Sequence, residues 1–148
     1  MTRTLDVRIH NDLSEIGTVR DALDNLASEL GIPMQALMAL QVALDEVISN
    51  VVKYAWDDGA RHEFLVRITV HPERMDLEIF DDGREFNPLS APEPEPPAAG
   101  QRPKPGGLGI QMVRRLVDGF SYQRVDGRNH TTISKTRAVG PAVQGSNT

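Results

Sequence analysis

The 148-residue sequence has no cysteine, which excludes a disulfide framework and a metal site built on thiolates. Its four histidines show neither i,i+4 nor His-x-His spacing, so the sequence does not predict a metal ion held by protein side chains alone. The longest apolar stretches are too short to span a bilayer, and the N-terminus lacks the apolar run of a signal peptide. We therefore expect a cytoplasmic protein without a membrane partner.

Positive charge is also scarce, since 16 Lys and Arg face 21 Asp and Glu and leave a formal net charge of −5. This balance favours solubility and disfavours a nucleic-acid-binding surface. The length suits one domain with a single core. We expect that domain over residues 1–137, followed by a frayed tail over residues 138–148 that has no apolar pattern.

Apolar spacing in the first half of the chain predicts a strand, two helices and two further strands. The first of these helices is expected to bury Leu13 with the apolar residues that follow it at helical spacing. The expected elements are a strand over residues 4–9, a helix from a cap at Asn11 or Asp12 to a stop at Gly31, a helix from Pro33 to about Trp56, and strands over residues 64–70 and 75–80.

The second half begins with a segment, residues 88–105, that carries most of the ten prolines and is expected to be extended or mobile. After it come an amphipathic helix over residues 110–118, stopped by Gly119, and a hairpin over residues 120–135. This order of elements predicts an α+β fold. It would be a two-layer α/β sandwich, with helices on one face of a mixed, mostly antiparallel sheet.

Polar side chains continue the second predicted helix beyond its apolar half. Residues 36–44 hold one polar side chain, and a helix that is apolar on every side is normally buried. Helical geometry puts Glu46 and Asn50 one turn apart on one stripe, and Lys53 follows a turn later. Alone, the pattern also fits a helix that emerges from the core at Asp45 and carries surface residues.

Asp81 ends a predicted strand, and Gly83 follows two residues later. A carboxylate in this position can accept a hydrogen bond from an exocyclic amine such as that of adenine. Glycine allows the backbone to turn sharply or to approach a ligand closely. In isolation, an ordinary Asp-Gly turn explains the same two residues.

Three glycines, Gly106, Gly107 and Gly109, stand at the start of the predicted helix after the proline-rich segment. Glycines there free backbone N–H groups to point at an anion, and a helix N-terminus adds partial positive charge. A flexible hinge that closes the preceding loop is the alternative. The cluster is neither a Walker A loop, because no Gly-Lys-Ser/Thr follows it, nor a Rossmann fingerprint, because no strand precedes it.

In this order, the motifs resemble the GHKL ATPase superfamily, which has the Bergerat ATP-binding fold. "ALDEVISNVVKYAW" resembles its N box, "DDGREF" its first glycine box, "GGLGIQMVRRL" its second glycine box, and residues 88–105 its ATP lid. The resemblance covers about Leu5 to Lys135. Within the superfamily the chain is similar to the small stand-alone anti-sigma serine/threonine kinases of the RsbW and SpoIIAB type.

The resemblance implies ATP and Mg²⁺ as cofactors. It makes Glu46 the general base and Asn50 the ligand of a Mg²⁺ ion bound to the ATP phosphates. It makes Asp81 the acceptor of a hydrogen bond from the adenine amine, with Gly83 letting the chain pass the base. Lys53 shares the stripe of Asn50 and is a candidate either for the phosphates or for solvent. The residues implied for the phosphates are Gly106, Gly107, Leu108 and Gly109.

Two functions follow from the resemblance. One is a serine/threonine kinase that phosphorylates an anti-anti-sigma (STAS-domain) protein and sequesters a sigma factor, with a homodimer possible. The other is an ATP-binding anti-sigma module that transfers no phosphate. The presence of Glu46 favours the kinase, because binding alone needs no base. The catalytic half of a histidine kinase is disfavoured, since no histidine falls in a predicted helix.

Overall fold

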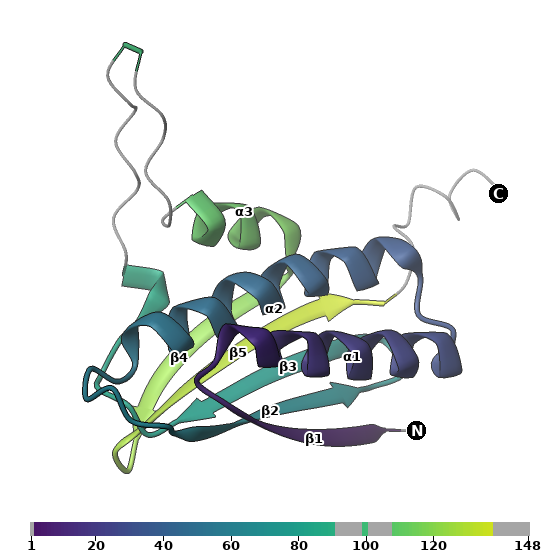
Figure 1. Cartoon of the computed structure of the whole chain (residues 1–148). Coiled ribbons are helices and arrows are strands. Elements are labelled where there is room, and N and C mark those ends of the chain that lie inside the picture. The colour runs from purple at the N-terminus through teal and green to yellow at the C-terminus, as the bar shows by residue number, and fades with distance from the viewer. Residues whose placement is uncertain (1, 91–98, 101–107, 138–148) are drawn as a thin grey trace, which may run out of the picture.

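The computed structural model describes residues 2–90, 99–100 and 108–137 (Figure 1). The predicted tail, most of the predicted lid over residues 88–105, and the glycines at 106 and 107 lie outside the described residues. What the sequence predicts for them stays a prediction.

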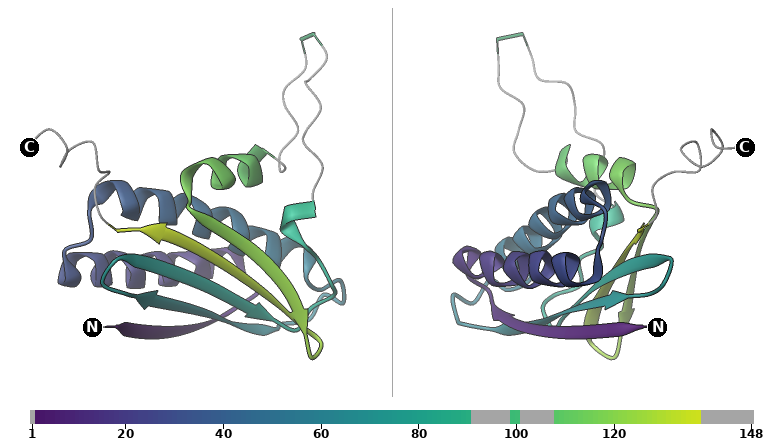
Figure 2. Two further views of the ribbon diagram at one scale, coloured as in Figure 1. Left: turned by 180° about the vertical axis from the view of Figure 1, so that it is seen from behind. Right: turned by 90° about the vertical axis from the view of Figure 1, so that its right-hand side faces the viewer.

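Five strands form one sheet in the order β1-β2-β3-β5-β4, and each neighbouring pair is antiparallel. The prediction of an α+β fold with helices on one face of a sheet is confirmed, and within the described strands the sheet is fully antiparallel where a mixed one was expected (Figures 1 and 2). The strands are β1 (Arg3–His10), β2 (Glu63–Val70), β3 (Arg74–Asp81), β4 (Gly119–Val125) and β5 (Arg128–Thr136).

A two-residue turn joins β4 to β5. Asp126 and Gly127 both have positive φ, 53° and 76°, as the central residues of a type I′ turn require. This turn sets the register that places Arg124 opposite Asn129 in the hairpin. Asn129 is the first residue of β5 that faces the helices, and it pairs with Asp81 at the end of β3.

In the part of the chain that the structure describes, the helical layer contains three α-helices and two short 3-10 turns. Asp12 caps a 3-10 turn, so the first α-helix begins only at Ile16, and Leu13 is half exposed where the sequence predicted a buried residue. Gly31 ends that helix in the left-handed conformation, as predicted. The elements are η1 (Leu13–Glu15), α1 (Ile16–Leu30), α2 (Met34–Tyr54), η2 (Pro88–Ser90) and α3 (Leu108–Leu116).

The stop predicted for the last helix at Gly119 is wrong. The α3 helix ends at Leu116, and Gly119 is the first residue of β4, where it pairs with Ser134 of β5. A Cβ on Gly119 would lie 3.4 Å from the Ser134 side chain. That distance is an ordinary van der Waals contact, so Gly119 is a strand residue rather than a helix stop, and the pairing with β5 does not itself require glycine.

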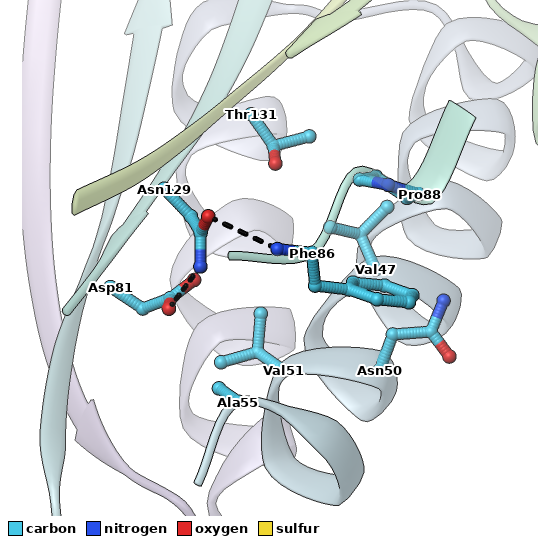
Figure 3. A pocket seen from close by; sticks show the side chains of 9 residues that line it. All are labelled: Val47, Asn50, Val51, Ala55, Asp81, Phe86, Pro88, Asn129 and Thr131. Atoms are coloured by element: carbon cyan, nitrogen blue, oxygen red, sulfur yellow. Dashed lines mark hydrogen bonds between the residues drawn. The ribbon is translucent and has the colours of Figure 1, made fainter. Parts of the chain in front are cut away.

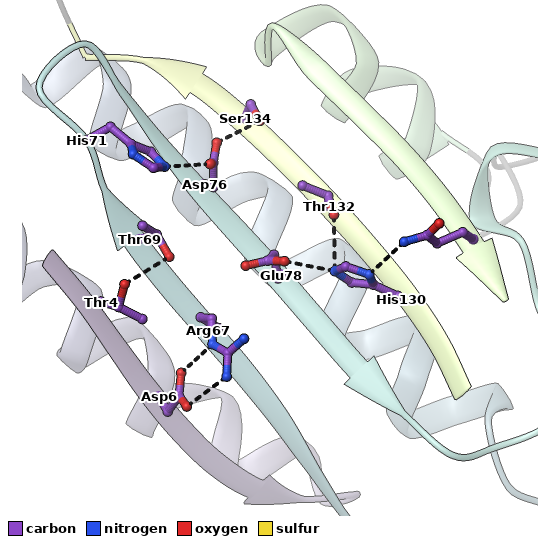
Figure 4. A network of polar contacts seen from close by, with 11 residues as sticks. Thr4, Asp6, Arg67, Thr69, His71, Asp76, Glu78, His130, Thr132 and Ser134 are labelled. Atoms are coloured by element: carbon purple, nitrogen blue, oxygen red, sulfur yellow. Dashed lines mark hydrogen bonds and ion pairs between the residues drawn. The ribbon is translucent and has the colours of Figure 1, made fainter. Parts of the chain in front are cut away.

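The outer face of the sheet, which none of the described helices covers, carries a row of polar contacts that runs across the strands (Figure 4). Asp6 of β1 accepts two hydrogen bonds from Arg67 of β2, at 2.8 and 3.2 Å. The Arg67 guanidinium lies 5.3 Å above the Phe80 ring, which stacks on His130 of β5. His130 in turn contacts Glu78 at 2.9 Å. These side chains are polar and contact one another, so this face of the sheet can be exposed to water. The apolar core lies on the side of the sheet that faces the helices.

The α2 helix is the centre of the core. It contacts α1, α3, β3 and β5, but its first half is not buried on every side as its composition predicted, because Met34 and Met38 form an exposed face. By length and composition it could cross a membrane, yet half of that apolar window is buried inside this domain, as expected of a core helix. Its buried residues are Ala36, Ala39, Leu40, Ala43, Leu44, Val47, Ile48 and Val51.

Shortening a side chain at the centre of α2 should be costly. Leu44 is completely buried, and Leu44→Ala should lower the free energy of unfolding by about 2–5 kcal/mol, because a cavity replaces close packing. Met38, on the same helix, is 60% exposed, and Met38→Ala should change that free energy by less than about 0.5 kcal/mol. Urea unfolding of both variants checks this. Equal losses would contradict the assignment of α2 as the core helix.

Candidate functional site

A small cavity lies between α2, the ends of β3 and β5, and the segment that follows β3 (Figure 3). Its volume is about 20 Å³, which is room for roughly one water molecule. Its walls combine apolar side chains with one carboxylate and two amides. The lining residues are Val47, Asn50, Val51, Ala55, Asp81, Phe86, Pro88, Asn129 and Thr131.

Asp81 is the buried charge of this cavity. It continues the inward face of β3 after Leu77 and Ile79, so the alternation of the strand points its side chain into the helical layer, where it is 6% exposed. Burial raises the pKa of the Asp81 carboxyl above its usual value, and hydrogen bonds from Asn129 and Gly83 oppose that rise. Burying an ionised carboxylate costs free energy unless hydrogen-bond donors or a positive charge compensate for its lost hydration.

Asn129 is the main partner of Asp81 and is itself 2% exposed. Its Nδ2 donates to Asp81 Oδ1 at 2.9 Å and to the Arg84 carbonyl oxygen at 2.8 Å. Its Oδ1 accepts from Arg124 Nη1 at 3.0 Å and from the Tyr122 hydroxyl. One amide thus ties together β3, β4, β5 and the turn that follows β3.

The turn after Asp81 packs against the end of α2. Arg84 donates from its backbone N–H to the Ala55 carbonyl at 2.8 Å and from Nε to the Tyr54 carbonyl at 2.6 Å. A Cβ on Gly83 would overlap the backbone of Ala55. Close packing on Ala55 is therefore a sufficient reason for glycine here, and the predicted passage past a ligand remains a separate prediction.

Phe86 closes the cavity. Its ring lies next to Val47 and Asn50 in Figure 3 and sits 5.8 Å, centroid to centroid, from the ring of Tyr54. Its backbone N–H makes a long contact of 3.4 Å with Asn129 Oδ1. Because the cavity has room for roughly one water molecule, a planar ligand requires a movement of its walls, of which the Phe86 ring is one.

A second cluster forms where α2 meets α3. A Cβ added to Gly109 would overlap the Glu46 carboxylate, so the acid lies directly against the first turn of α3. A helix N-terminus attracts negative charge, which explains the position of a carboxylate there. The same partial charge would attract a phosphate group. Glu46 and Asn50 are one turn apart on α2, so the two clusters are neighbours.

The structure thus brings together Asn50 and Asp81 in one cavity, and Glu46 and Gly109 in one contact. Lys53 is exposed, and it is not among the described residues that line the cavity. The other implied phosphate residues are not placed, because residues 106 and 107 and the side chain at 108 lie outside what the structure describes.

Sequence reasoning missed Asn129 and Thr131. Both are buried, at 2% and 5% exposure, although they are polar. A usable signal was present, because alternation back from the buried Ile133 puts both on the inward face of β5. Where two successive inward-facing positions of a strand are polar, that part of the strand is expected to line a polar site rather than the apolar core.

The chain belongs to the family described as "Histidine kinase-like ATPase domain", whose model matches residues 9–135. "Serine/threonine-protein kinase BtrW" of Bordetella bronchiseptica is 32% identical over 101 residues, which cover 67% of this chain and 70% of that protein. "Serine-protein kinase RsbW" of Halalkalibacterium halodurans is 26% identical over 128 residues, with 84% and 78% covered. The protein of the same name from Bacillus subtilis is 22% identical over 137 residues, with 90% and 84% covered.

A solved structure shares the fold. The crystal structure of the RsbU and RsbW domains of Rv1364c from Mycobacterium tuberculosis matches 93% of this chain with a TM-score of 0.66 and 15% sequence identity. This chain spans 34% of that longer chain. Family membership implies that the domain binds ATP.

The cavity has the chemistry that an adenine ring needs. Val47, Val51 and Pro88 supply apolar walls, and Asp81 supplies an acceptor for an amine. No described residue donates a hydrogen bond to Asp81 Oδ2, so one carboxylate oxygen is available. The space of about 20 Å³ is too small for a purine, so binding requires lining residues such as Phe86 to move.

Removing the negative charge of Asp81 should weaken adenine nucleotides. Asp81→Asn should cost about 1–3 kcal/mol of ADP affinity, the loss expected for one charge-assisted hydrogen bond. The ionised form of Asp81 is the form that accepts the hydrogen bond from adenine. Because the pKa of Asp81 is raised, this form is lost at a higher pH than the ionised form of an ordinary aspartate. Calorimetry at a series of pH values that decrease from neutrality should therefore show a decline in the wild type that exceeds the decline in Asp81→Asn.

Asp76→Asn is the matched control, since Asp76 lies on the same strand but faces the outer side of the sheet. It should keep wild-type ADP affinity and the wild-type pH dependence. Equal ADP affinity in the wild type and Asp81→Asn at neutral pH would remove Asp81 from the binding site.

Proposed function

We propose that this chain is an ATP-dependent protein serine/threonine kinase that phosphorylates a STAS-domain anti-anti-sigma protein and sequesters a sigma factor in a cytoplasmic partner-switching pathway. One observation carries the proposal: the Glu46 carboxylate lies at the first turn of α3, one helical turn from Asn50. A base, an amide and an anion-attracting helix end thus meet beside the cavity. Relatives named as serine-protein kinases support the same conclusion.

Each residue has a distinct task in this proposal. Asp81 accepts the hydrogen bond from the adenine amine and so fixes the nucleotide at its base. Asn50 offers its amide oxygen to Mg²⁺, which, when bound, neutralises phosphate charge. The backbone at the start of α3, with Gly109, receives the phosphates, together with the glycines predicted at 106 and 107. Lys53 is exposed and can assist only from the rim of the site.

Glu46 is the proposed catalytic residue. It takes the proton from the hydroxyl of the partner's serine or threonine while the oxygen forms a bond to the γ-phosphorus. The bond from that phosphorus to the bridging oxygen breaks, and ADP leaves with its electron pair. Phosphoryl transfer depends mainly on positioning and charge neutralisation, so a modest set of groups is sufficient.

A binding module that transfers no phosphate is the second candidate. The observation in its favour is that the cavity, which Phe86 lines, has only about 20 Å³ of space, so nucleotide must rearrange its walls and could act as a switch for partner binding. The catalytic half of a histidine kinase is disfavoured further, because all four histidines lie outside helices. His10 and His130 are in strands, and His62 and His71 are in connecting segments.

The two candidates differ at Glu46. Glu46→Gln keeps the shape of the side chain and removes the base, so phosphorylation of the STAS-domain protein should fall by about 10²–10⁴-fold. ATP affinity should stay close to that of the wild type, because the base contributes little to the ground state. Transfer of label from γ-labelled ATP to serine or threonine of the partner, with calorimetry in parallel, measures both quantities.

Asp45→Asn is the matched control. Asp45 points away from the site and pairs with Arg20 of α1, an exposed salt bridge whose loss should cost no more than about 1 kcal/mol of stability. It should phosphorylate as fast as the wild type. If Glu46→Gln were equally fast, or if the wild type transferred no phosphate, the kinase assignment would be wrong and the binding module would replace it.

A further inference from the structure

We infer that Asn129 is a positioning residue that sets the base specificity of the site, by holding Asp81 so that its free oxygen accepts only from a base that carries an amine. The inference rests on the proposed adenine-nucleotide site and adds the residue that distinguishes a 6-amino purine from a 6-oxo purine.

The orientation of the Asn129 amide is fixed by the chemistry of its neighbours. Arg124 can only donate, so the oxygen of the amide must face its guanidinium, 3.0 Å away. The backbone N–H of Phe86 can also only donate, and it faces the same oxygen. The amide nitrogen must therefore point the other way, towards the Arg84 carbonyl and Asp81 Oδ1.

The fixed amide determines which oxygen of Asp81 is available. Oδ1 receives two donors, Asn129 Nδ2 at 2.9 Å and the Gly83 backbone N–H at 3.0 Å. Oδ2 receives no donor from the described residues. The carboxylate is thus anchored through one oxygen, and the other remains for a ligand in the cavity that Asp81 lines.

An anchored carboxylate discriminates by charge. Ionised Oδ2 only accepts hydrogen bonds, so it pairs with the 6-amino group of adenine and repels the 6-carbonyl oxygen of hypoxanthine. Without the Asn129 donor, the Asp81 side chain can rotate towards the neighbouring N1–H of hypoxanthine, or take up a proton and donate to its carbonyl. Either change reduces the preference for ATP over ITP.

A purely structural role for Asn129 makes a different prediction. The same amide also binds Tyr122, Arg124 and the turn at Arg84, so its loss could loosen the whole corner. Loosening would weaken all nucleotides alike and leave the ratio of ITP to ATP dissociation constants unchanged. That ratio therefore separates positioning from stability.

The test is a calorimetric measurement of ATP and ITP dissociation constants with the full chain. Wild type should prefer ATP, and Asn129→Ala should reduce that preference by roughly tenfold, the effect of one hydrogen bond to a charged group. Because the Asn129 donor favours the ionised form of Asp81, the pH at which ATP affinity falls should also move upward in Asn129→Ala. Asn129→Ser, whose short side chain cannot span to Asp81, serves the same test if Asn129→Ala does not fold.

Tyr122→Phe is the control, since it removes a donor to the opposite end of the same amide and leaves Nδ2 facing Asp81. Its ratio should equal that of the wild type. An unchanged ratio in the Asn129 variants, with both affinities lowered together, would overturn the inference while ATP binding stands. No binding of either nucleotide to the wild type would overturn the proposed function itself, and this inference with it.

Discussion

The hydrogen bond between Asn129 and Asp81 is the contact on which the site depends. A carboxylate that is 6% exposed carries a desolvation cost, and the fold meets that cost with one side-chain amide and one backbone N–H. Both donors come from outside β3, so Asp81 is held only when β5 and the turn at Gly83 are in place. The site is therefore a product of the finished sheet rather than of one motif.

The α2 helix connects this contact to the rest of the molecule. The helix packs on α1, α3 and the sheet, and these contacts fix it as a rigid element. Its second half then presents Asn50 to the cavity and Glu46 to the first turn of α3. Functional side chains on a helix anchored in this way keep their geometry better than side chains on loops. The polar continuation of an apolar helix is thus explained by what the two halves contact.

Much of the fold could be predicted because it follows from local chemistry. Alternation placed Phe64, Val66 and Leu77 in the core, and Gly31 marked a helix end through its left-handed conformation. Other features depend on long-range packing that no local pattern encodes. The place of Gly119 was misjudged because a glycine beside an adjacent strand reads like a helix stop.

The candidate site divides in the same way. Asp81, Asn50 and Glu46 could be proposed from spacing and family resemblance, and the fold places them in neighbouring clusters. Alternation in β5 marks Asn129 as an inward-facing polar residue, but its pairing with Asp81 could not be predicted, since that requires knowing that β5 lies beside β3. The Phe86 ring in the cavity also follows only from three-dimensional packing.

The most direct measurement of the central claim is a crystal structure of the chain with Mg-ADP. The account predicts the adenine amine against Asp81 Oδ2, the Asn129 amide in its present orientation, and the Phe86 ring displaced from the cavity. A base bound elsewhere, or a Phe86 ring that keeps its present position with ADP present, would contradict it.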